Sequence, residues 1–190
     1  ELPAKLSDNL EALLQENCFT VCTAHQPNIF TGHLYFIFKI LHAIKLAAAL
    51  TEAIPQHHFV PVYYMGSEDA DLEELGEITV NAKKYTWDTK QTGAVGRMLV
   101  DKDFIKLIDG LEAQLAVEKY GSEIISLLRK IYTNGKTIEQ ATFELVHELF
   151  GQYGLITLMP DSPVFKAAFA PVIKKELQEQ FSKKAVDETL

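Results

Sequence analysis

The stretch that decides the fold is FTVCTAHQPNIFTGHLYFIFKILHAIKLAAALTEAIPQHHFVPVYYM, residues 19–65. Its first part, Phe19–Thr23, is rich in β-branched and aromatic residues and predicts a strand. The apolar stretch from Gly32 to about Ala53 predicts a long helix, and the continuous apolarity of Phe59–Met65 predicts a strand buried on both faces. Together they predict a β-α-β unit. Because the helix is apolar nearly all round, we expect sheet on one side of it and further protein on the other.

The rest of the chain adds elements of both kinds around this unit. A helix is expected at Leu6–Glu16, and two strands at Ile78–Trp87 and Ala94–Val100 joined by the polar turn Asp88–Gly93. Helical periodicity follows at Asp103–Val117, Ser122–Tyr132 and Ile138–Phe150, then a buried strand at Leu155–Met159. Asp161-Ser162-Pro163 is a helix start signal, and Pro171 should break or kink the charged amphipathic helix that follows.

These elements define an α/β protein with a parallel sheet. The parallel strands number only three, near positions 20, 62 and 157, which is few for a doubly wound sheet. The chain also starts without Met and ends inside a helix that has no stop signal. We therefore expect the 190 residues to be a piece of a longer protein.

Composition excludes several classes of function. The chain is 47% apolar and 23% charged, as in globular proteins, and its 18 basic and 26 acidic side chains give a net charge of −8. This charge disfavours nucleic acid and anionic membranes as partners. Lys39, His42 and Lys45 interrupt the apolar helix, which therefore predicts a core helix and not a membrane span. With no signal peptide pattern, a cytoplasmic protein is expected, with Cys18 and Cys22 as buried reduced thiols.

The first candidate site is the loop of residues 23–33, which leads into the long helix. The free N–H groups and positive dipole end of a helix favour phosphate or carboxylate there. Gly32 would let a ligand approach the backbone, Thr31 could cap the helix, and Lys39 reaches such an anion only marginally. The hydrogen-bonding side chains of the loop are His25, Gln26 and His33. An ordinary capped turn explains the same residues, and the sequence leaves both interpretations open.

The second candidate site is the acidic segment Gly66–Glu74, directly after the buried strand. Five of seven consecutive residues are acidic: Glu68, Asp69, Asp71, Glu73 and Glu74. Such like charges repel, so some should be paired, protonated or turned to a cation. A carboxylate here could act as a general base toward an amine, or could hold a Mg²⁺ that carries nucleotide phosphates, although no metal site is firmly predicted. The alternative is a helix start with Ser67 as its N-cap.

Four motifs in order resemble one known family. They are HQPNIFTGHLYFIFKILHAIKLAAAL (25–50), FVPVYYMGSEDADLEEL (59–75), GAVGR (93–97) and LFGQYGLITLMPDSP (149–163). The sequence resembles the BshC family of bacillithiol biosynthesis proteins from about His25 to Pro171. GAVGR by itself lacks the full glycine pattern of a dinucleotide-binding loop.

The resemblance implies a Rossmann-like core with a small β segment, an inserted helical region and, in the complete protein, a coiled-coil arm. The expected division is 1–76 for the first part of the core, 77–101 for a β-rich connecting segment, 102–151 for the helical insertion, and 152–190 for the return to the core and the start of a following helix.

The family pattern carries over residue by residue. It is kept at His25, Gln26, Phe30, Thr31, Gly32, Tyr35, Lys39, all five acids of the second segment and Asp161. It departs at Ala24 (Gly expected), His33 (Pro), Ala70 (His) and Gly76 (Asn). The missing histidine at position 70 matters most, because imidazole is the natural proton shuttle near neutral pH. Either that histidine is not essential, or the activity has diverged.

The implied reaction joins cysteine to glucosaminyl-malate, with ATP as the expected activator of the cysteine carboxyl group. The catalytic candidates are Glu68, Asp69 and Asp71. The residues expected to bind substrate or nucleotide are His25, Gln26, Thr31, Gly32, His33, Lys39, Ser67, Glu74 and Asp161. The expected partners are these small molecules, and a homodimer through a helical region outside this sequence is left open.

Two other functions stay open. Phe30-Thr31-Gly32-His33 is similar to half of the His-x-Gly-His signature of nucleotidylyl transferases, with Phe30 in place of the first histidine. The third hypothesis is a non-catalytic helical interaction module on a degenerate Rossmann core.

Overall fold

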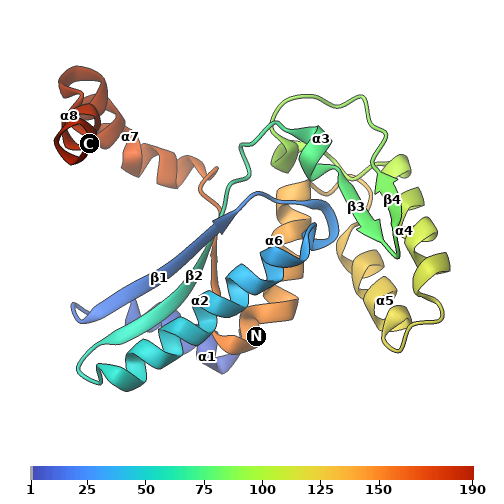
Figure 1. Cartoon of the computed structure of the whole chain (residues 1–190), viewed down its shortest axis with the longest axis horizontal. Helices are drawn as coiled ribbons and strands as arrows, with labels where there is room; N and C mark the ends of the chain where they lie inside the picture. The colour runs from blue at the N-terminus through green and yellow to red at the C-terminus, as the bar shows by residue number, and fades with distance from the viewer. Residues whose placement is uncertain (1) are drawn as a thin grey trace. The chain divides into compact units, whose positions relative to one another are not determined.

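The structure, a computed structural model, describes residues 2–190. The chain forms two compact units, one ending at Met159 and one comprising Pro160–Leu190. The first unit contains a three-stranded sheet and a separate two-stranded hairpin (Figure 1). The fold is α/β, as the sequence predicts.

The three-stranded sheet is parallel. Its strands are β1 (Cys18–His25), β2 (His58–Met65) and β5 (Ile156–Leu158), in the order β1-β2-β5. The strands predicted near positions 20, 62 and 157 are therefore confirmed. Both cysteines lie on β1, and the prediction that both are buried is wrong for Cys22, which is exposed because β1 is an edge strand.

Helix α2 (Leu34–Ala53) connects β1 to β2 and packs against both strands. Its buried side chains follow helical spacing on one face: Phe36, Ile40, Ala43 and Ala47. The predicted β-α-β unit is confirmed. Within residues 2–190, α2 is the single helix whose length and composition would allow it to cross a membrane, and 22% of its most apolar window is buried. Its outer face is exposed, so the further protein expected there lies outside the described residues.

The antiparallel hairpin is shorter than predicted. It pairs β3 (Glu77–Val80) with β4 (Lys83–Thr86) through Asn81 and Ala82, both with positive φ. A two-residue turn of this kind matches the twist of a hairpin, although Ala is an unusual residue in it. The prediction of strands at 78–87 and 94–100 is therefore wrong. The second of these segments instead contains a 3-10 turn, η2 (Val95–Arg97).

The three predicted helices of the middle region are confirmed as α4 (Lys102–Leu115), α5 (Gly121–Ile131) and α6 (Ile138–Phe150). Helix α6 belongs to two hydrophobic cores. Its first half packs with α4, α5 and the hairpin, while Val146 and Phe150 pack with α2 and β2. The helical region and the sheet are therefore joined by shared packing.

The remaining elements are short or lie at the ends. They are α1 (Ala4–Ala12), η1 (Ile29–Thr31), α3 (Leu72–Leu75), η3 (Gly151–Tyr153), α7 (Pro163–Glu179) and α8 (Phe181–Thr189). Pro163 occupies the first turn of α7 as predicted. The expected break at Pro171 is wrong, because α7 continues through it and ends at Gln180 in a left-handed conformation.

Candidate functional site

The two candidate segments begin side by side at the carboxyl ends of neighbouring strands. His25 ends β1 and Met65 ends β2, and the two residues are partners in the sheet register. The backbone N–H of Gly66 donates to the carbonyl of His25 at 2.9 Å. Ligands of open α/β sheets bind at this end of the strands. The fold thus brings the two predicted segments to a position suited to a ligand.

A side-chain hydrogen bond joins the two segments. Gln26 Nε2 donates to Asp69 Oδ2 at 3.1 Å, and the other oxygen of Asp69 accepts from the backbone N–H of Asp71 at 2.9 Å. The bond from Asp71 and then that from Gln26 lower the pKa of Asp69. Asp69 is therefore ionised at neutral pH and is a weaker base than an ordinary aspartate.

His25 lies in an aromatic environment beside this pair. Its ring centroid is 5.0 Å from that of Tyr35 and 5.5 Å from that of Phe36. Burial lowers the pKa of His25, so the imidazole is neutral at pH 7. Its Nδ1 lies 3.1 Å from the carbonyl of Gln26. Because a carbonyl only accepts, Nδ1 carries the proton and Nε2 keeps its lone pair.

His33 joins the same row of rings, because its ring stacks on Tyr35 with centroids 5.7 Å apart. It precedes the first residue of α2, and its side chain makes no capping hydrogen bond. The suggestion that Thr31 caps this helix is wrong, since Thr31 ends η1. The first turn of α2 contains no acidic residue, so its positive dipole end keeps its attraction for an anion.

Gly32 is required by the loop geometry. Its φ of 59° is left-handed, and a Cβ there would lie 2.5 Å from the Cβ of Asn28. Phe30 and Thr31 before it also have positive φ, 51° and 75°. Three such residues in succession turn the chain sharply into α2, a conformation that glycine adopts without strain.

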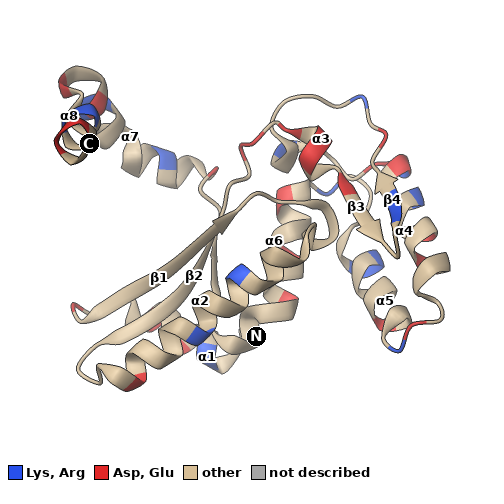
Figure 2. Cartoon of the chain, viewed as in Figure 1, with Lys and Arg blue, Asp and Glu red and all other residues tan. Residues whose placement is uncertain are grey.

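The acidic segment starts a short helix, but not as predicted. Asp71 is the N-cap of α3 and its Oδ1 accepts from the backbone N–H of Glu74 at 3.2 Å. Ser67 is fully buried and does not cap α3, so that prediction is wrong. Glu68, Glu73 and Glu74 are exposed. Figure 2 shows the acidic side chains along α3 and the loop before it.

The segment Gly93–Arg97 supports the acidic loop from below. The backbone N–H of Val95 donates to the carbonyl of Asp69 at 2.8 Å, and that of Gly96 to the carbonyl of Ser67 at 3.2 Å. A Cβ on Gly96 would lie 2.5 Å from the Ser67 carbonyl oxygen. Sequence reasoning missed this role, and the only signal for it is the glycine within GAVGR.

Two expected site residues have other contacts. Lys39 Nζ donates to the carbonyl of Ala24 at 2.5 Å, so its ammonium group covers the end of β1. Asp161 belongs to the second unit and forms an ion pair with Lys166 of α7.

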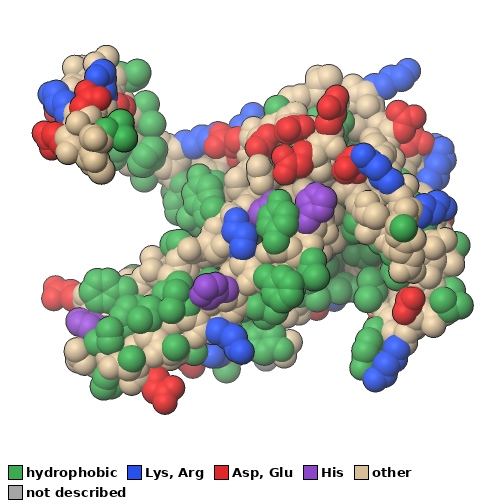
Figure 3. All heavy atoms as spheres, in the orientation of Figure 1, with side chains coloured by type: hydrophobic (Ala, Val, Ile, Leu, Met, Phe, Trp, Pro, Cys, Tyr) green, Lys and Arg blue, Asp and Glu red, His purple; other side chains and the backbone are tan. Residues whose placement is uncertain are grey.

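No cluster for a metal ion forms in the described part of the chain, where no three His, Cys, Asp or Glu side chains come together suitably. The site instead has two electrostatic halves. The first turn of α2 attracts anions, and the acidic loop attracts cations such as ammonium groups. Figure 3 shows histidine side chains next to the acidic cluster on the face in view.

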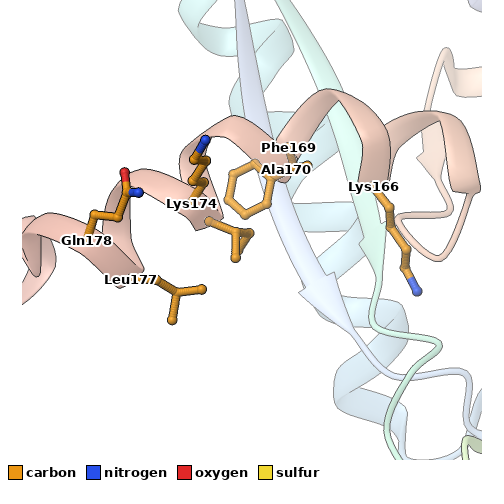
Figure 4. Close-up of a pocket in the computed structure, with 7 residues that line it drawn as sticks. Lys166, Phe169, Ala170, Lys174, Leu177 and Gln178 are labelled. Carbon is orange, nitrogen blue, oxygen red and sulfur yellow. The ribbon is translucent and has the colours of Figure 1, made fainter.

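The second unit offers a different kind of surface. A shallow pocket lies along α7 and is lined by the side chains labelled in Figure 4, among them Phe169 and Leu177 with the lysines Lys166 and Lys174. Neither α7 nor α8 contains a buried residue. This pocket lacks the polar groups that a reaction needs.

Fold and site together define an α/β protein with a small-molecule site at the carboxyl ends of parallel strands. The profile of the family described as "Bacillithiol biosynthesis BshC, N-terminal Rossmann-like domain" matches residues 1–190. The chain belongs to this family of bacillithiol biosynthesis proteins.

Curated relatives agree with this assignment. The chain is 36% identical to a protein of Flavobacterium johnsoniae and 37% identical to one of Flavobacterium psychrophilum, in both cases over its whole length and 36% of the relative. It is 39% identical to a protein of Cytophaga hutchinsonii over 93% of this chain and 32% of the relative. Each is named "Putative cysteine ligase BshC". The chain thus spans about a third of the length of these relatives, in agreement with the expectation of a longer protein.

Proposed function

We propose that this chain forms part of a ligase that joins the carboxyl group of cysteine to the amine of glucosaminyl-malate. The observation that carries the proposal is the Gln26–Asp69 hydrogen bond, which joins the two electrostatic halves of the site. Glucosaminyl-malate carries both an amine and carboxylates. The acidic loop suits its ammonium group, and the first turn of α2 suits an anion, either a carboxylate or the activated group.

Amide formation needs an activated carboxyl group, because a free carboxylate does not react with an amine. In our proposal ATP supplies this activation by turning a carboxylate oxygen into a leaving group. The uncapped first turn of α2 fits a phosphate chemically, since it presents backbone N–H donors and carries no acidic side chain. The loop around Gly32 leaves the backbone accessible on the ligand side.

The attacking amine must also lose a proton. The sequence suggests Asp69 or Asp71 as the base, but both carboxylates already accept backbone N–H groups. His25 suits the role better in our proposal, because its imidazole is neutral at pH 7 and its Nε2 is the lone-pair nitrogen. Asp69 then holds the loop and contributes negative charge toward the substrate ammonium group.

The nucleotidylyl transferase hypothesis finds little support in the geometry. Its first histidine position is Phe30, whose ring packs 5.0 Å from Phe104 and 5.1 Å from Tyr132. The backbone N–H of Phe30 donates to the Tyr132 hydroxyl at 3.2 Å. Phe30 therefore belongs to the hydrophobic core.

The experiment measures coupling of cysteine to glucosaminyl-malate by the full-length protein, with and without ATP, in wild type, His33→Pro and Ala70→His. The φ of −70° at His33 suits proline, so we expect His33→Pro to change turnover less than about threefold. A loss of about a hundredfold together with lost ATP binding would favour the nucleotidylyl transferase hypothesis. Absence of any ligand binding or turnover would favour the interaction module.

A further inference from the structure

One side of β1 has no neighbouring strand among the described residues. The carbonyls of Asn17 and His25 accept from the backbone N–H groups of His58 and Gly66, so odd-numbered residues of β1 face β2. Backbone groups alternate along a strand. Those of Thr20, Cys22 and Ala24 therefore point to the open edge, and all three residues are exposed. Figure 1 shows β1 at the edge of the sheet.

An open edge eight residues long is unusual in a folded protein. Edge strands are normally short, charged, bulged or covered, because their free backbone groups otherwise pair with other chains. Here the one visible cover is the ammonium group of Lys39 on the carbonyl of Ala24. The rest of the edge, over Thr20 and Cys22, carries no charged side chain.

The surroundings of this edge are also apolar. Phe19 on β1 is 49% exposed, and Tyr35 and Leu46 of α2, on the same helix face as Lys39, are 44% and 41% exposed. Figure 3 shows apolar side chains along the outer face of α2. Parallel sheets occur almost only where both faces are covered. The exposed surface therefore has the character of an interior that lacks its cover.

The opposite edge of the sheet does not share this character. Helix α1 packs against β5 and η3, with Leu6 buried and Asn9 Nδ2 donating to the carbonyl of Gly154 at 2.7 Å. In chain order the strands lie third, second, first across the sheet. In a doubly wound sheet the next strand then joins beside the first.

We propose that a strand from the part of the polypeptide outside residues 1–190 pairs in parallel with the open edge of β1. The relative from Flavobacterium johnsoniae has ample chain for this, since the sequence matches only 36% of its length. The added strand makes β1 an interior strand and pairs the backbone groups of Thr20, Cys22 and Ala24.

The added strand also bears on the candidate site. Where strand order reverses, the crevice at the carboxyl ends of the strands is the ligand site. That reversal falls between β1 and the new strand, beside His25 and Gln26. On the proposed function, the loop after the new strand supplies the wall of the site that the described residues lack.

Hydrogen exchange on the full-length protein tests this inference without reference to activity. Residue-resolved exchange should protect the amides of Thr20 and Cys22 to within about tenfold of Val21 and Thr23, whose amides face β2 and serve as matched controls. Exchange of Thr20 and Cys22 a hundredfold or more faster than their neighbours would overturn it. Protection that disappears on dilution would also overturn it, because the occupant would then be a second copy of the chain.

Discussion

Gln26 Nε2 donates a hydrogen bond of 3.1 Å to Asp69 Oδ2, although 43 positions separate the two residues in the sequence. Gln26 follows β1, and Asp69 lies four residues beyond the end of β2. The parallel pairing of the two strands makes this contact possible, because it starts both loops at the same edge of the sheet. One bond thus couples the loop before α2 to the acidic loop.

The lowered pKa of Asp69 predicts a dependence of stability on pH. Two hydrogen bonds favour the ionised form in the folded state, so the stabilisation is present above the ordinary aspartate pKa of about 4 and is lost as the pH falls through the lower, folded value. Thermal melts of full-length wild type and Asp69→Asn should therefore converge below about pH 4. We expect a difference of less than about 1 kcal/mol, because the group is partly solvated. A gap independent of pH would contradict this.

The lowered pKa of His25 predicts the pH dependence of turnover. The value of kcat/KM should rise with pH through a pKa below the ordinary value of about 6.5, and His25→Gln should abolish this limb and cost about a hundredfold or more. Since the folded state resists protonation, His25 should also make the protein less stable as the pH falls below about 6.5. His33→Gln, which changes the other histidine stacked on Tyr35, is the control and should keep the limb.

The support beneath the acidic loop predicts a strong effect of Gly96→Ala. The added methyl group would lie 2.5 Å from the Ser67 carbonyl oxygen and 2.6 Å from its Cβ, so backbone must move. We expect a loss of about 1–3 kcal/mol of stability and reduced turnover. Gly93→Ala is the matched control: its Cβ meets nothing within 4 Å, and its φ of +94° costs about 1–2 kcal/mol without displacing the site. Equal turnover in the two variants would argue against this support.

The strands and long helices were predictable because their patterns are local. The apolar run 59–65 and the helix after Gly32 carry enough periodicity to define the β-α-β unit. The hairpin was predicted at the wrong place because its turn, Asn81-Ala82, lacks the usual glycine. The polar segment predicted as the turn is instead held by Asp101, which accepts from Trp87 Nε1 at 3.0 Å and from the Thr89 hydroxyl at 3.1 Å.

The site was predictable in position but not in its contacts. Strand ends indicated which loops matter, while the partners of Gln26, Lys39 and Ser67 depend on tertiary packing. The role of Lys39 shows the difference. Its spacing suggested a weak anion contact, whereas the fold places its ammonium group on the carbonyl of Ala24.

The central claim is that the joined loops form one site for the ligation reaction. A double-mutant cycle in the full-length protein, with Gln26→Ala, Asp69→Ala and both together, tests it through kcat/KM for coupling cysteine to glucosaminyl-malate. Exposed Glu52, near the far end of α2, provides the control variant Glu52→Ala. We predict that each single change lowers kcat/KM at least about tenfold and that the double variant is hardly worse than either, because both remove the same bond. Unchanged turnover in both single variants, or losses that simply multiply, would contradict the account.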